Sequence, residues 1–321
     1  MMKKFLLILS LLILPAGCGQ EKKQVKKESN LREKILPPVK QPDSGPEGSN
    51  YLFSTISIIE DGEGAGKVKI FYPDNLSSAA PVVVFIHGYT AISPDFYRLW
   101  ISHIVRKGNI IIYPYYQTML SVDIESMFNN LTSSTTRALK ILDNEDIPHS
   151  LRICFMGHSL GGYFSAVIAG MYRKLSLPEP ACIFAVEPGT VLPLKEENFN
   201  GIPTSTLLIT LSAEDDFVAG SIYADKIFNE ATRIPSYRKT RITMLSDSHG
   251  DYPLIADHLA PLSGESTTNA LDWYGFWKWS EALIECSFYG ENCNYINDTP
   301  EARFMGLWSD GTPVKQPLIE K

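Results

Sequence analysis

The sequence LRICFMGHSLGG at residues 151–162 carries the strongest structural signal in the chain. Its apolar first half is typical of a buried β-strand, and a helical pattern follows its last glycines. The middle fits G-x-S-x-G, in which a sharp strand-to-helix turn strains the backbone and lifts the serine above the sheet edge. We therefore predict that Ser159 is a nucleophile, with Gly157 and Gly161 where strand and helix pass too closely for a side chain.

The alternation of strands and helices extends on both sides of this turn. Residues 54–59 and 67–72 are β-branched or alternating runs around a glycine-rich turn, which predicts an opening antiparallel pair. Apolar, strand-like runs lie at 82–86, 110–113, 182–186, 206–211 and 241–245, with helix-length segments at 96–107, 124–143, 161–175 and 220–230. This order predicts an α/β fold with a mostly parallel central sheet flanked by helices. The aromatic residues of 271–288 have helical spacing, so we expect them in the core.

A serine nucleophile needs a base, and the base needs an acid that orients it. Two polar loops supply such residues in the order Ser, Asp, His. They read SAEDDFV at 212–218 and SDSHG at 246–250. Each loop directly follows a predicted strand, and open α/β sheets bind their ligands at the carboxyl ends of the strands. We predict Asp215 as the acid and His249 as the base.

Other residues compete for these two roles. Asp216 is the adjacent carboxylate, and Glu187 follows an earlier strand. His258 is the competing base, but it does not immediately follow a strand. His158 stands next to the nucleophile, and we expect it to line the cleft.

With these motifs in place, residues 51–310 resemble the α/β-hydrolase superfamily of serine hydrolases. In that superfamily the acid often stands third after a small residue and three before a valine, as Asp215 does. The loop GYTA at 88–91 is similar to that of cutinase-like polyester hydrolases, and residues 96–114 are similar to chlorophyllase and dienelactone hydrolase relatives. No large insertion follows the sixth strand, so we expect no lid domain. An open cleft suits accessible or bulky esters.

The resemblance also implies where the oxyanion of the reaction is bound. Two preorganised N–H groups stabilise the negative charge that develops on the carbonyl oxygen. One is the backbone amide of Leu160, directly after the nucleophile. The superfamily places the second donor after a His-Gly pair, which here is the backbone amide of Tyr89. His87 is then a structural residue.

The cysteines predict a disulfide and no metal site. Cys286 and Cys293 flank a turn, and in an exported protein a bond between them is expected. No CxxC motif or Cys/His cluster indicates zinc. We expect neither a metal nor an organic cofactor.

The N-terminus reads as a targeting segment. Two lysines precede an apolar run at 5–14, which is too short to span a bilayer and suits a secretory signal. The sequence LPAGC at 14–18 resembles the lipobox of bacterial lipoproteins, in which the cysteine, here Cys18, is lipidated and becomes the first mature residue. This implies a signal peptide at 1–17 and an exported cell-envelope lipoprotein anchored to a bacterial membrane. Polar residues continue to 49, so we predict a lipidated cysteine and flexible tether at 18–49 and a catalytic domain at 50–321.

Composition restricts the partners. The net charge is −7, and the negative excess lies after residue 49. An acidic body argues against nucleic acid, because phosphate contacts need a basic face. Hydrophobic residues make up 44% of the chain, enough for a large core, and we expect a monomer.

These observations favour a carboxylic ester hydrolase on the cell surface. Ser159 would attack an ester carbonyl, His249 would accept its proton, Asp215 would orient the imidazole, and water would release the acyl group. One alternative is an amidase, peptidase or acyltransferase with the same triad. The other is a catalytically inactive lipoprotein that binds a ligand. Residues 304–311 have no role that the sequence assigns.

Overall fold

The computed structural model describes residues 33–264 and 268–321 of the chain. The predicted signal peptide and Cys18 lie outside the described residues. Residues 34–321 form one compact unit. Within the described ranges, no helix combines the length and the apolar character that crossing a bilayer requires.

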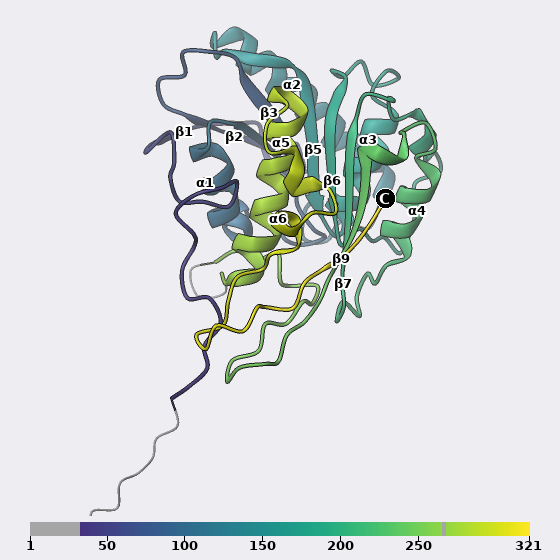
Figure 1. Cartoon of the computed structure of the whole chain (residues 1–321). Helices are drawn as coiled ribbons and strands as arrows, with labels where there is room; N and C mark the ends of the chain where they lie inside the picture. Colours follow the sequence, from purple (N-terminus) through teal and green to yellow (C-terminus); the bar gives the residue numbers. More distant parts are fainter. Residues whose placement is uncertain (1–32, 265–267) are drawn as a thin grey trace, which may run out of the picture. The chain divides into compact units, whose positions relative to one another are not determined.

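A nine-stranded sheet forms the centre of this unit (Figure 1), in the order β1-β2-β4-β3-β5-β6-β7-β8-β9. The strands that run parallel to one another are β3 (Ala80–Ile86), β4 (Ile110–Pro114), β5 (His149–His158), β6 (Pro180–Val186), β7 (Leu207–Ala213) and β8 (Lys239–Met244). The antiparallel strands are β1 (Ile56–Asp61), β2 (Val68–Pro73) and β9 (Leu318–Glu320). The predicted parallel sheet and its opening antiparallel pair are confirmed.

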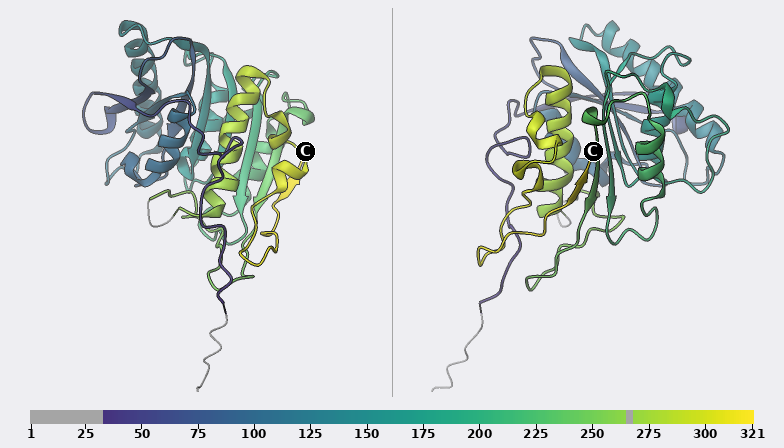
Figure 2. Two further views of the ribbon diagram at one scale, coloured as in Figure 1. Left: turned by 60° about the vertical axis from the view of Figure 1, so that its left-hand side comes forward. Right: turned by 45° about the vertical axis from the view of Figure 1, so that its right-hand side comes forward.

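Helices cover both faces of the sheet (Figure 2). On one face lie α2 (Ile124–Asn144), α3 (Leu160–Gly170) and α4 (Ile222–Glu230), and on the other lie α1 (Arg98–Arg106) and α5 (Lys278–Tyr289). The alternation of side chains along β3 explains the two layers: Val82 and Val84 pack with the first set, whereas Val83 and Phe85 pack with the second.

Short helical segments complete the chain. They are η1 (Gly64–Gly66), η2 (Pro94–Tyr97), η3 (Phe199–Gly201), η4 (Ser236–Arg238), the π-helix η5 (Asp272–Trp277), η6 (Cys293–Ile296) and α6 (Pro300–Arg303). Phe276, Trp277 and Trp279 of η5 and α5 are buried, so the aromatic segment belongs to the core as predicted. Between β6 and β7 the chain forms only loops and η3, which is too little for a lid domain.

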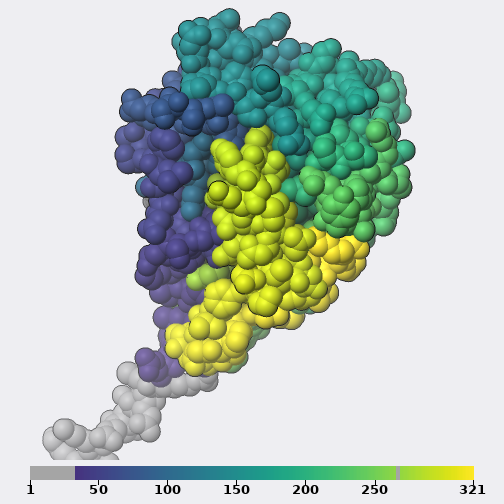
Figure 3. Space-filling model, turned by 45° about the horizontal axis from the view of Figure 1, so that its top comes forward, coloured from purple at the N-terminus to yellow at the C-terminus, as the bar shows by residue number. Residues whose placement is uncertain are grey.

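The predicted boundary at residue 50 is wrong, because residues 34–49 are part of the compact unit. This segment, the N-terminal strap, packs against the C-terminal part of the chain (Figure 3). The amide of Ile35 donates to Asp251 Oδ2 at 2.8 Å, the Leu36 carbonyl accepts from the Ser309 amide at 2.9 Å, and the Pro46 carbonyl lies 3.0 Å from His103 Nε2. The strap is extended and is held through its backbone, so its side chains need no apolar periodicity. Its sequence therefore looks like that of a flexible tether.

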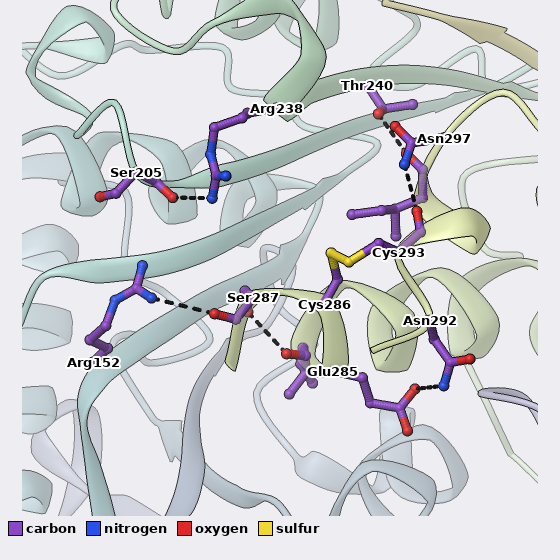
Figure 4. Close-up of a disulfide and its surroundings, with 12 residues drawn as sticks. Arg152, Ser205, Arg238, Thr240, Glu285, Cys286, Ser287, Asn292, Cys293 and Asn297 are labelled. Atoms are coloured by element: carbon purple, nitrogen blue, oxygen red, sulfur yellow. Dashed lines mark hydrogen bonds between the residues drawn. A yellow bond between two sulfur atoms is a disulfide. The ribbon is translucent and has the colours of Figure 1, made fainter. Parts of the chain in front are cut away.

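The two cysteines predicted to pair lie together near the end of α5. Cys286 and Cys293 are bonded, with their Cα atoms 4.9 Å apart (Figure 4). The turn between them is held by Asn292, whose side chain donates to Glu285 at 2.7 Å. A bond that closes a loop of this size contributes roughly 2–3 kcal/mol to stability.

The N-terminal strap gives a prediction about stability. We expect a fragment of residues 50–321 to unfold at a lower temperature than residues 34–321, because it loses several hydrogen bonds of about 1 kcal/mol each and exposes the buried His103. Thermal unfolding followed by circular dichroism compares the two fragments. Equal midpoints would show that the strap does not stabilise the body.

Candidate functional site

Ser159 stands at the turn between β5 and α3, and the turn has the strained backbone that the motif predicts. Its φ of 57° and ψ of −122° are unusual for a residue with a side chain. The backbone amide of Ser159 donates to the Val186 carbonyl of β6 at 2.9 Å. This bond and the start of α3 hold the hydroxyl group at the carboxyl edge of the sheet.

Glycine is required at two positions around the serine. A Cβ atom at Gly161 would lie 2.0 Å from the carbonyl oxygen of Ile86 in β3, and one at Gly157 would lie 2.3 Å from the Gly161 carbonyl. Both distances are far below contact distance and involve backbone atoms. The predicted close approach of strand and helix is therefore present.

The serine hydroxyl begins a chain of hydrogen bonds. Ser159 Oγ lies 2.9 Å from Nε2 of His258, and Nδ1 of the same ring lies 2.9 Å from Asp216 Oδ2. The other oxygen of Asp216 accepts the backbone amides of Val218 and Ala219 at 2.8 and 2.9 Å. Burial alone would raise the pKa of Asp216, but the hydrogen bonds from His258 and from the two amides outweigh it and lower the pKa. The carboxylate is thus ionised beside the imidazole.

The ring nitrogen that contacts the serine hydroxyl does not belong to the predicted base His249. The Nε2 atom of His249 lies 2.9 Å from Asp310 Oδ2 instead. Asp247 and Leu254 bond to each other through both backbone groups, at 2.8 and 2.9 Å, so the chain turns back on itself between them. This short excursion holds His249 at its tip and returns the chain to the sheet edge, where His258 contacts Ser159. The structure thus contradicts His249 as the base, because the histidine that contacts Ser159 is His258.

The predicted acid Asp215 holds this returning loop in place. Its Oδ2 accepts the hydroxyl of Ser246 at 2.6 Å, and its amide donates to the Ala256 carbonyl at 2.9 Å. Its side chain therefore bonds the loop after β8, whereas the neighbouring Asp216 bonds the imidazole. The structure thus contradicts Asp215 as the acid, because the carboxylate that bonds His258 is that of Asp216.

The C-terminal segment at 304–311 acquires a structural role. Trp308 is buried and donates its indole N–H to Asp247 Oδ2 at 2.9 Å, and its ring packs edge-on against His249. Asp310 holds His249 from the other side. These contacts fix the excursion that precedes His258.

His158 is buried and is not among the residues that line the cavity at Ser159. The prediction that it lines the cleft is therefore wrong. The Tyr97 hydroxyl accepts the Gly88 amide at 3.0 Å and donates to His158 Nδ1 at 2.9 Å. The Nε2–H group of His158 then donates to the backbone carbonyl of His258 at 3.0 Å. Burial lowers the pKa of His158 to about 3, so the ring stays neutral. This network links the loop after β3 to the loop that carries the base.

His87 has the structural character that the sequence predicted. Its ring is buried and stacks on Tyr116 with centroids 4.2 Å apart. Its backbone carbonyl accepts the Tyr116 hydroxyl at 2.6 Å. Burial lowers the pKa of His87 to about 4.

An apolar cavity opens beside the serine. Its volume is about 520 Å³, and its lining includes Ser159 together with both predicted oxyanion residues, Tyr89 and Leu160. The remaining lining residues are mostly apolar: Val122, Ile124, Met127, Gly189, Thr190, Val191, Leu192, Val218, Ala219, Ile222 and Tyr223. The loop of Tyr89 presses against the nucleophile, since a Cβ atom at Gly88 would lie 3.3 Å from Ser159 Cβ.

One group of side chains within the described ranges has the composition of a metal site. Ligand atoms of His158, Glu187 and His258 all lie within 4.8 Å of one another. Both ring nitrogens of each histidine already lie within hydrogen-bonding distance of other groups. A cation held by either ring would have to displace a hydrogen bond that the ring already makes, so the donor set does not fit a resident metal.

Comparison with known protein families gives a match over part of the chain. Residues 59–194 match the family model described as Chlorophyllase. The fold is that of an α/β-hydrolase. The predicted resemblance to chlorophyllase relatives is thereby confirmed, and the match supports an esterase-like hydrolase. A search of the curated proteins gave no match. The matched region contains Ser159 but ends before Asp216 and His258, which are assigned from the geometry alone.

The glycine contacts predict a severe defect on substitution. We expect Gly161→Ala to destabilise the protein well beyond the roughly 1 kcal/mol of an average substitution, because the added methyl group has no room. Gly66→Ala is the matched control, since nothing lies within 4 Å of a Cβ atom there. Urea unfolding of both variants measures the difference. Similar midpoints for the two would contradict the close approach.

The corrected base gives a second prediction. His258→Ala is expected to slow the labelling of Ser159 by a fluorophosphonate probe by about 10²-fold or more, because the hydroxyl loses its proton acceptor. His249→Ala should retain most of the wild-type rate, because Trp308 and the backbone of Leu254 still hold Asp247. Gel fluorescence over a time course gives both rates. Loss of labelling in the His249 variant with retention in the His258 variant would restore the original assignment.

Proposed function

We propose that the protein hydrolyses carboxylic esters with Ser159 as nucleophile, His258 as base and Asp216 as orienting acid. The observation that carries the proposal is the continuous hydrogen-bond chain from Ser159 through His258 to Asp216 beside an apolar cavity. A neutral imidazole that accepts the serine proton makes the oxygen nucleophilic. Asp216 fixes the ring and stabilises its charged form.

The reaction then proceeds in two stages. Ser159 Oγ bonds to the ester carbonyl carbon while its proton passes to His258 Nε2, and the amides of Tyr89 and Leu160 stabilise the oxyanion. The protonated ring then donates this proton to the departing alcohol. The acyl group remains bonded to Ser159 Oγ. Water, deprotonated by the same nitrogen, attacks the acyl carbon; the bond to Ser159 Oγ then breaks, His258 returns the proton to that oxygen, and the acid is released.

The cavity indicates an apolar substrate. Several of its lining residues are strongly exposed at the mouth, among them Val191 with 96% and Val218 with 76% of its surface accessible. Phe217, next to Val218 in the chain, and Leu120, two residues before Val122, are also exposed, at 91% and 90%. Exposed apolar patches of this kind mark binding sites more often than chance. We therefore infer that the ester carries a bulky apolar group.

A series of p-nitrophenyl esters from acetate to palmitate tests the function. We expect wild-type protein to turn over these esters and Ser159→Ala to be inactive. A fluorogenic amide series is assayed beside them. Turnover of amides without turnover of esters would contradict the ester assignment, and inactivity on both would favour a binding protein.

The cavity assignment has its own variant. Ile222→Trp narrows the cavity, so we expect a rise in KM for long-chain esters and little change for the acetate ester. The ratio of kcat/KM between the two substrates measures the effect. An equal loss on both substrates would show that Ile222 does not contact the acyl chain.

We also propose that Cys18 carries a lipid anchor and that the catalytic unit is displayed on the cell envelope. The LPAGC sequence supports the anchor, and the Cys286–Cys293 pair suits an oxidising compartment. The Cys18→Ser variant is expected to lose incorporation of labelled fatty acid and to partition into the aqueous phase of a detergent extraction. Retention of the label would contradict the proposed position.

A further inference from the structure

Exposed apolar side chains surround the mouth of the cavity beside Ser159. Four of them line the cavity and are largely exposed, and two more lie within two residues of a lining residue in the chain. We call this set the apolar rim: Leu120, Val122, Val191, Phe217, Val218 and Ile222. The rim comes from the chain after β4, β6 and β7, so it belongs to the carboxyl edge of the sheet, where the nucleophile lies.

The stretches of chain that carry the rim have no charged side chains. Residues 114–122, 188–194 and 217–224 contain no Asp, Glu, Lys or Arg. Single exposed apolar residues are common on proteins, but an apolar patch marks a site that contacts a protein, a ligand or a membrane. An ester inside the cavity would cover the cavity walls, whereas Leu120 and Phe217 are not among the lining residues. The rim therefore offers apolar surface to a partner larger than a small substrate.

The N-terminal strap begins at the same edge of the sheet. The amide and the carbonyl of Ile35 both bond Asp251, at 2.8 and 2.9 Å, and Lys34 Nζ donates to the Tyr252 hydroxyl at 2.7 Å. Asp251 and Tyr252 lie in the excursion of the loop after β8 (Figure 1). Because this loop also follows the carboxyl end of a strand, the strap begins on the side of the sheet that carries the nucleophile.

The proposed lipid anchor is close to this point in the sequence. Residues 19–33 separate Cys18 from Lys34, and a chain of that length spans at most roughly 55 Å when fully extended. A bilayer that holds the acyl chains of Cys18 is therefore always within that distance of the start of the strap. The bilayer is thus a large apolar partner that the chain itself brings to this edge of the sheet.

We propose that the apolar rim docks on the lipid bilayer that carries the anchor, with the mouth of the cavity turned toward the lipid. The rim side chains enter the boundary between headgroups and acyl chains, as the apolar faces of interfacial proteins do. The ester then reaches Ser159 from the lipid without crossing water. This route of entry rests on the proposed ester hydrolysis, whereas the docking does not.

The charge of the protein indicates which bilayers the rim should prefer. The negative excess of the chain lies after residue 49, so the body is repelled by anionic headgroups. Docking must then come from apolar contact, which salt does not screen. We expect binding to uncharged phosphatidylcholine vesicles that is equal at low and high salt. Binding only to anionic vesicles at low salt would show an electrostatic contact and would overturn the role of the rim.

Sedimentation with phosphatidylcholine vesicles tests the docking. The protein used is residues 19–321, which contain the whole compact unit but neither Cys18 nor the apolar run at 5–14. Binding by this fragment therefore reports on the folded surface. The rim variant combines Leu120→Glu with Phe217→Glu. We expect its partition coefficient to be lower by about tenfold or more, because each glutamate places a charge where the acyl chains begin.

A matched control carries the same two charges on the opposite edge of the sheet. Leu151 lies near the start of β5, and Tyr237 lies directly before β8; both are strongly exposed, at 87% and 71%. The control variant combines Leu151→Glu with Tyr237→Glu, and it should bind vesicles as the unsubstituted fragment does. Circular dichroism confirms that each variant is folded.

Three outcomes of the binding experiment would overturn the docking. The first is no binding by the unsubstituted fragment. The second is an equal loss in the rim variant and the control variant. The third is a dimer in solution that the rim variant abolishes while vesicles bind neither protein, which would assign the rim to a second copy of the chain.

Hydrolysis of a lipid ester separates the docking from the proposed function. A fluorogenic acylglycerol in phosphatidylcholine vesicles is assayed beside the water-soluble acetate ester, and the ratio of the two rates is compared between proteins. We expect the rim variant to lower this ratio by about tenfold or more and the control variant to keep it. If the fragment binds vesicles through the rim but hydrolyses neither ester, the docking stands and the proposed hydrolysis fails. If it hydrolyses the acetate ester but binds no vesicles, the hydrolysis stands and the docking fails.

Discussion

The close crossing of α3 over β3 and β5 is the constraint on which the site depends. At Gly161 the helix approaches the Ile86 carbonyl so closely that a methyl group would lie 2.0 Å away. This contact forces the turn at Ser159 into its strained conformation and presents the hydroxyl at the carboxyl edge of the sheet. All other parts of the site are loops that follow strands and converge on that one atom.

Adjacent polar residues in these loops have different tasks. Asp216 bonds the imidazole, while Asp215 beside it bonds Ser246 and Ala256 and so places the loop of His258. His158 links the Tyr97 hydroxyl, on the oxyanion side, to the carbonyl of His258. The support of the site is thus built from residues that bond the loops of Ser159, Asp216 and His258 to one another. The proposed chemistry requires its groups to be held in one geometry, and these hydrogen bonds restrict how the loops can move.

The sequence predicted the fold and the strained turn at Ser159 well because both depend on local patterns. Buried parallel strands are continuous apolar runs, and G-x-S-x-G requires only a strand before it and a helix after it. Which carboxylate and which histidine come together with Ser159 depends on the three-dimensional path of the loops after β7 and β8. His249 stands nearer to its strand than His258, but the Asp247–Leu254 bridge turns it away from the serine. The N-terminal strap was missed for a similar reason, since backbone hydrogen bonds leave no pattern in side chains.

The most direct test of the central claim is to trap and locate the acyl group. Wild-type protein and the His258→Ala variant are mixed with an activated ester, quenched in acid within the first turnover, and analysed by intact mass and peptide mapping. The wild type should gain the mass of one acyl group on the peptide that contains Ser159, and the variant should gain almost none in the same time. Acylation at another residue, or equal acylation of both proteins, would contradict the Ser159–His258–Asp216 mechanism.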